Sequence, residues 1–180
     1  MNLKQQFKRQ CFSNEYELVN GVIMHAENGD AFRIPPPVIK RRLGLGHFVE
    51  LRMDSPRFSV HEDDAEQCAC PSCNGKMSKP ILRHEHPATL LPLQEQDVPS
   101  RGWGEDFWVR TTQRDGQFLL GIVDNPLREA RLHGVTIGDE IVFHEDHVLA
   151  VHGVHREDLV SGMNEAELRE LVGWIESQSE

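Results

Sequence analysis

A proline-rich stretch in the middle of the chain, residues 62–100, most limits what this sequence can fold into. It holds five of the ten prolines and shows little hydrophobic periodicity, so neither long helices nor a packed sheet is favoured there. Irregular chain of this length is unusual in a compact protein unless something ties it down. The stretch divides the sequence into an N-terminal β-rich part (1–61), a middle segment (62–100) and a C-terminal α+β part (101–180), and one compact domain can contain all three.

The middle segment also carries three of the four cysteines, Cys68, Cys70 and Cys73. From Cys70 the sequence reads Cys-Pro-Ser-Cys-Asn-Gly-Lys, which resembles the knuckle of a zinc ribbon over about seven residues. Two thiolates three positions apart in a tight turn can bind one metal ion. Small residues after the second cysteine let backbone N–H groups approach the sulfurs. We therefore expect zinc as a structural cofactor.

A tetrahedral zinc ion needs two further ligands, because a second knuckle is absent from the sequence. The candidates are Cys68, His84, His86 and, much further away in sequence, Cys11. One possible set is Cys68, Cys70 and Cys73 with His84 or His86. The other is Cys70 and Cys73 with both histidines, which share a face in extended chain. Free thiols are the alternative interpretation, and a redox site is disfavoured because no strand–turn–helix pattern surrounds the motif.

The charge and hydropathy of the chain exclude several classes of function. A net charge of −10 and a pI near 5.4 disfavour binding to nucleic acid. There is neither an apolar run long enough to span a membrane nor a secretory signal, so we expect a cytoplasmic protein. Thiols are reduced in that compartment, which favours metal binding over disulfides. The three adjacent cations at residues 40–42 are expected to form a solvated face.

The N-terminal part contains several short elements. Residues 21–25 and 31–34 flank an Asn-Gly pair, which predicts a β-hairpin. A short helix is expected over residues 38–43, with Pro37 at its first position. Apolar residues then alternate over residues 47–53, which predicts a strand with its odd-numbered side chains in the core.

The C-terminal part has the most regular pattern. Strands are predicted at residues 107–112, 117–123, 140–143 and 148–151, with a tight hairpin turn at 114–116. Asn164 and Glu167 form a capping box before an amphipathic helix at 165–176, which we expect to close the sheet. The predicted fold class is α+β, with an antiparallel sheet, a C-terminal amphipathic helix and a zinc-knuckle segment in the middle.

Three motifs in this part carry a resemblance to a known family. They are Phe-Trp-Val at residues 107–109, Gly-Ile-Val-Asp-Asn-Pro at 121–126, and Gly-Asp-Glu-Ile-Val-Phe at 138–143. Together they resemble a small bacterial domain family of unknown function, whose usual tryptophan after the last motif is absent here. The resemblance implies a small α+β fold and no activity.

These observations favour a non-enzymatic zinc-binding protein that serves as a protein-interaction or adaptor module. Three thiolates and one imidazole would fill the coordination of zinc and leave no position for a catalytic water. The alternative is a metal-dependent hydrolase that uses His144 and His147, or His84 and His86 with a nearby carboxylate such as Glu85. For His144 and His147 we favour a polar surface near a strand end.

The aromatic residues Trp103 and Trp108 are expected to anchor the core, and a small binding surface is the alternative.

Overall fold

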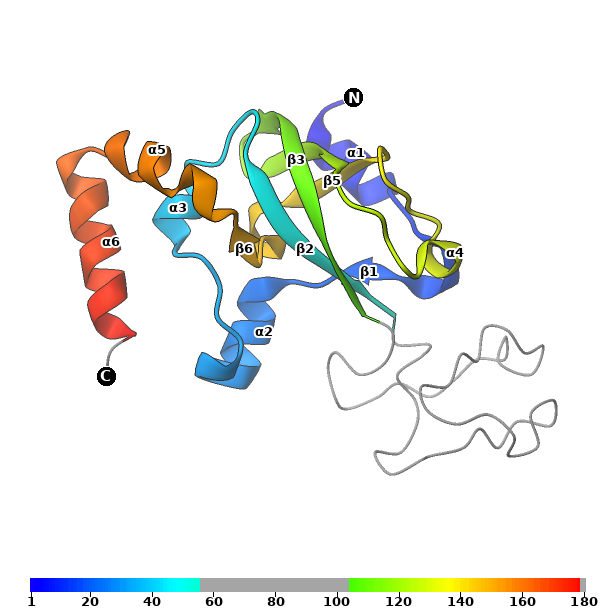
Figure 1. Ribbon diagram of the computed structural model, residues 1–180, viewed down its shortest axis with the longest axis horizontal. Coiled ribbons are helices and arrows are strands. Elements are labelled where there is room, and N and C mark those ends of the chain that lie inside the picture. Colours follow the sequence, from blue (N-terminus) through cyan, green and yellow to red (C-terminus); the bar gives the residue numbers. More distant parts are fainter. Residues whose placement is uncertain (56–103, 179–180) are drawn as a thin grey trace.

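The computed structural model describes residues 1–55 and 104–178, and a six-stranded antiparallel sheet lies at its centre. The strands are β1 (Glu17–Leu18), β2 (Phe48–Asp54), β3 (Glu105–Asp115), β4 (Phe118–Val123), β5 (Glu140–His144) and β6 (Ala150–Val151). They follow the order β1-β2-β3-β4-β5. β6 returns to pair with β2 opposite Val49 and Glu50, beside the part of β2 that pairs with β1. This return bends the sheet almost into a barrel (Figure 1).

Short helices surround the sheet, which confirms the predicted α+β class. The α-helices are α1 (Leu3–Arg9), α2 (Gly21–Asn28), α3 (Pro37–Arg41), α4 (Ala130–His133), α5 (Arg156–Ser161) and α6 (Glu165–Ser177). Within residues 1–55 and 104–178, single turns of 3₁₀-helix are η1 (Ser13–Glu15), η2 (Gly29–Ala31), η6 (Glu145–His147) and η7 (Gly153–His155). None of the helices in the described ranges is long and apolar enough to cross a bilayer.

The hydrophobic core takes side chains from both sides of the middle segment. Val49, Leu51 and Met53 of β2 are fully buried, as the period of two predicts. They pack in one cluster with residues of the later strands, including Phe107 and Phe143. The parts before and after residues 56–103 therefore share one sheet and one core.

The predicted hairpin at residues 21–34 is wrong, because residues 21–28 form α2. The side chain of Asn20 accepts hydrogen bonds from the N–H groups of Val22 and Ile23, which starts a helix. Gly29 has a φ of 56° and ends it. An Asn-Gly pair suits a helix end as well as a hairpin turn, since both need a residue that tolerates positive φ.

The predicted helix with Pro37 at its first position is α3, but its cations do not form a solvated face. Lys40 is buried, and its ammonium lies 3.7 Å from the carboxylate of Asp146 in η6. Arg41 pairs with Glu170 at 2.5 Å, and Arg42 pairs with Glu167 at 2.8 Å. These ion pairs join α3 to η6 and to α6.

Helix α6 forms where the capping box predicts it, with Asn164 and Glu167 bonded reciprocally. The expectation that it closes the sheet is wrong. None of its residues is buried, and Figure 1 shows it at one end of the molecule, beyond α3 and α5. The 3.6-residue period identifies an apolar face but not its neighbour, and here the ion pairs of α3 hold the helix away from the sheet.

Candidate functional site

The five predicted zinc ligands, Cys68, Cys70, Cys73, His84 and His86, lie outside the described residues. Trp103 and Glu85 do as well, so the zinc site stays a prediction. Residues 56–103 connect the end of β2 to the start of β3, where Met53 lies directly opposite Glu105. The more distant candidate Cys11 is an exposed free thiol after α1.

His144 and His147 cap the turn between β5 and β6. The backbone N–H of Asp146 donates to Nδ1 of His144 at 3.2 Å, and the backbone N–H of His144 donates to Nδ1 of His147 at 3.1 Å. Their ring centroids lie 6.3 Å apart, and His147 is buried. The expected polar surface is wrong for His147, because that side chain is buried. One ring nitrogen of each histidine accepts a backbone N–H.

The described residues contain no group of three or more His, Cys, Asp and Glu side chains placed to hold a metal ion. With Nδ1 committed, His144 and His147 each retain only Nε2 for any ligand. A hydrolytic site here would need its further ligands from elsewhere in the chain.

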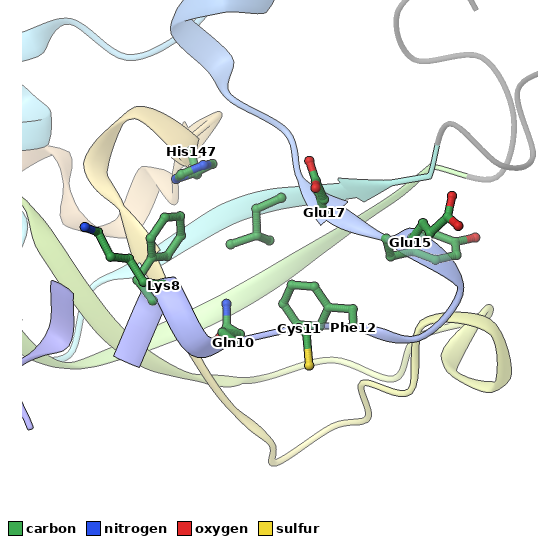
Figure 2. Close-up of a pocket in the computed structure, with 10 residues that line it drawn as sticks. Lys8, Gln10, Cys11, Phe12, Glu15, Glu17 and His147 are labelled. Carbon is green, nitrogen blue, oxygen red and sulfur yellow. The ribbon is translucent and has the colours of Figure 1, made fainter. Parts of the chain in front are cut away.

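A cavity of about 500 Å³ lies between α1, β1 and η6 (Figure 2). Its wall includes the rings of Phe7 and Phe12, the thiol of Cys11 and the imidazole of His147. Figure 2 shows the sulfur of Cys11 directed away from His147, so the two groups are not arranged as a nucleophile with its base.

Burial shifts the pKa values of two groups in the wall of this cavity, His147 and Tyr16. Burial lowers the pKa of His147 to about 4, so its imidazole is uncharged at neutral pH. Burial also raises the pKa of Tyr16, and the nearby carboxylate of Asp54 adds to that effect. Both shifts favour the uncharged form of the side chain, the imidazole of His147 and the phenol of Tyr16.

An apolar groove of about 570 Å³ lies at the other end of the molecule, between the loop before α3, β6, α5 and α6. Aliphatic and proline side chains form most of its wall, together with Trp174 of α6. The charged residues that line it are Arg33 and Arg156. Within the described ranges, the groove therefore combines an apolar floor with cations and no carboxylate.

The elements around the groove are placed by contacts that the sequence does not reveal. β6 is held by its pairing with β2, and the two ion pairs with α3 hold α6. Sequence periodicity does identify Leu171 and Ile175 as apolar-face residues of a helix. It assigns them to the core, whereas the structure places them in the wall of an open groove.

Apolar side chains of α6 remain in contact with solvent next to the groove. The exposed fraction is 38% for Leu168, 52% for Val172 and 51% for Ile175. An isolated helix of 13 residues is marginal in water, and most helical stability in proteins comes from burying an apolar face. This helix buries little, which marks the groove as the candidate binding surface.

No protein-family model matches the chain, and neither the curated proteins nor the solved structures yielded a match.

Proposed function

We propose that this protein is a non-enzymatic binding or adaptor module that docks an apolar segment of a partner protein in the groove beside α6. The observation that carries the proposal is the helix itself, which has no buried residue and lines an open apolar groove. In this proposal a zinc ion bound within residues 62–100 has a structural role, with the ligands predicted from the sequence.

The composition of the groove supports a protein segment as its occupant. Tryptophan is among the residues that concentrate binding energy at interfaces, and Trp174 supplies such an anchor here. Leu171 and Ile39 add apolar surface that an occupant would remove from water. An occupant that covers α6 would stabilise the helix and remove apolar surface from water in one step.

The charge around the groove specifies the partner further. Arg33 and Arg156 are the charged lining residues, although the whole chain carries a net charge of −10. A segment with apolar anchors and one or two flanking carboxylates complements this surface, whereas a basic segment would place cation against cation.

Peptide display against the purified full-length protein tests the groove. We expect enriched peptides to combine apolar residues with Asp or Glu, and Leu171→Asp to abolish their binding. Val172→Asp is the matched control, because Val172 lies next to Leu171 on α6 but does not line the groove. Arg156→Glu should weaken the acidic peptides.

Equal binding of the peptides to wild type and Leu171→Asp would contradict the proposal, provided that circular dichroism shows both variants folded. Enriched peptides whose sequence matches a segment of this chain would instead identify self-association.

Elemental analysis tests the zinc component separately. We expect one equivalent of zinc in the reduced wild type and its loss in Cys70→Ser, because removing a thiolate opens the coordination shell. A reduced wild-type protein free of metal would remove this component and leave the groove proposal standing.

A further inference from the structure

A small recess of about 340 Å³ opens on the outer face of the sheet, where β2, β3 and η7 meet. Its walls include the side chains of Phe48, Trp108 and His152, with the carboxylate of Asp124 at the rim. Val49 and Val109 point into the core, so their neighbours Phe48 and Trp108 point to the opposite face. No residue of the recess lines the apolar groove.

The imidazole of His152 stands at a steep angle to the rings of both Phe48 and Trp108. The centroids of Trp108 and His152 are 5.3 Å apart with an interplanar angle of 76°, and those of Phe48 and His152 are 6.4 Å apart at 68°. The imidazole therefore closes the recess from a different direction than the two larger rings, which gives the recess the form of a box. A box suits a rounded group, whereas a planar guanidinium prefers to stack between parallel faces.

Contacts behind the rings hold this arrangement in place. His155 stacks on Phe48 with centroids 5.6 Å apart, and its Nε2 accepts the backbone N–H of Phe48 at 3.0 Å. Nδ1 of His152 accepts the backbone N–H of Val154 at 3.3 Å. The walls are therefore largely pre-organised, which lowers the cost of binding.

Two carboxylates lie beside the rings, and the exposed Arg110 lies opposite Phe48. Asp124 is exposed at the rim, and Glu50 of β2 lies directly opposite Trp108 on the same face of the sheet. Burial raises the pKa of Glu50, and nearby Asp106 adds to that effect. Arg52 pairs with Asp106 at 2.9 Å, and none of the ion pairs within the described ranges uses Glu50.

We propose that this recess binds an alkylammonium group, held against the aromatic faces of Phe48 and Trp108 and near the carboxylates of Asp124 and Glu50. A cation over a tryptophan face gains cation–π energy, and methylated ammonium is favoured because it loses little hydration on entering. The group can belong to a free amine such as choline or to a lysine side chain of a protein.

Titration of the full-length protein with choline, followed by ¹H–¹⁵N correlation spectra, tests the proposal. The neutral control is 3,3-dimethyl-1-butanol, which has the shape of choline without its charge. We expect choline to shift the signals of Trp108 and its neighbours. We also expect choline to bind about tenfold more tightly than the alcohol, a difference in binding free energy of about 1.4 kcal/mol.

Variants separate the recess from other surfaces. Trp108→Leu keeps an apolar side chain but removes the aromatic face, and we expect it to weaken choline binding about fivefold or more. Asp124→Asn should weaken it less. Glu157→Gln, which removes an exposed carboxylate of α5 outside the recess, should leave it unchanged.

Short peptides that contain lysine or trimethyl-lysine distinguish the two sources of the cation. Tighter binding of a peptide than of choline assigns the recess to a protein side chain, and the reverse order assigns it to a free amine. The proposal is overturned if choline and the alcohol bind alike, if the shifts lie outside the recess, or if folded Trp108→Leu binds choline as well as wild type.

Discussion

Acidification is expected to weaken the fold through His147, which is buried between α1, β5 and η6. Its Nδ1 accepts the backbone N–H of His144, and its ring packs against Phe7 with centroids 5.3 Å apart. The titratable groups that act on its pKa are His144, Asp146 and Lys40. Protonation of Nδ1 would remove the acceptor of the N–H bond. The protonated Nδ1 could donate to the carbonyl oxygen of His144, 3.2 Å away, but the cation would lie in a buried site, where burial outweighs this bond.

The magnitude follows from the pKa of His147, which burial lowers from 6.5 to about 4. The imidazole of His147 is therefore protonated below about pH 6.5 in the unfolded chain but only below about pH 4 in the folded chain. The stabilisation is complete above the unfolded pKa and is lost as the pH falls through this window. A difference of about 2.5 pKa units amounts to roughly 3 kcal/mol, a large share of the 5–15 kcal/mol typical of a domain.

Urea unfolding of wild type and His147→Asn, from about pH 7.5 to about pH 4, measures this contribution. The Oδ1 atom of asparagine can accept the N–H of His144 and does not titrate. The variant loses the ring contact with Phe7 at every pH, so the informative quantity is the change in unfolding free energy with pH. We expect wild type to lose about 2–3 kcal/mol more than the variant over this range. Parallel curves for the two proteins would refute the argument.

Three further outcomes are expected. Chelation of metal should increase proteolysis within residues 62–100 and leave the sheet intact, and equal protection throughout would contradict a local zinc site. Arg42→Ala should raise amide exchange in α6 without affecting β2–β5, because Arg42 bonds Glu167 and the carbonyl of Gly162. Gly121→Ala should lower the melting temperature, since its Cβ would lie 2.9 Å from the carbonyl oxygen of Arg110. Gly173→Ala is the control: its added Cβ meets no atom within 4 Å, and alanine should raise the melting temperature by favouring the helix. An unchanged melting temperature for Gly121→Ala would refute the packing argument.

The sequence predicts the elements whose signals are local. β2, the β3–β4 hairpin, β5 and α6 all appear close to their expected positions, because alternation, turn residues and a capping box act over a few residues. The hairpin at residues 21–34 was wrong for a local reason too. The cap at Asn20 and the Asn-Gly pair at its end mark a helix as clearly as a turn.

The apolar groove could not be predicted in this way, because it depends on contacts between distant segments. Arg41 and Arg42 read as a cationic surface until their partners on α6, more than 120 residues later, are known. Leu171 and Ile175 lie on the apolar face of a helix that the sequence places against the sheet, for the same reason. Hydrophobic periodicity reports that a face avoids water, and only the tertiary arrangement decides whether that face is covered.

The histidines of the C-terminal part acquire one common role that ligand spacing does not suggest. In each, a ring nitrogen accepts a backbone N–H: His133 from Val135, His144 from Asp146, His147 from His144, His152 from Val154 and His155 from Phe48. An accepting nitrogen carries no proton, so these loops and turns use imidazole as others use Asn or Asp. Burial also lowers the pKa of His133, so its contribution to stability disappears on acidification in the same direction as that of His147. The residual pH dependence of His147→Asn therefore measures the acid sensitivity that comes from the remaining titratable groups, which include His133, His47 and Glu167.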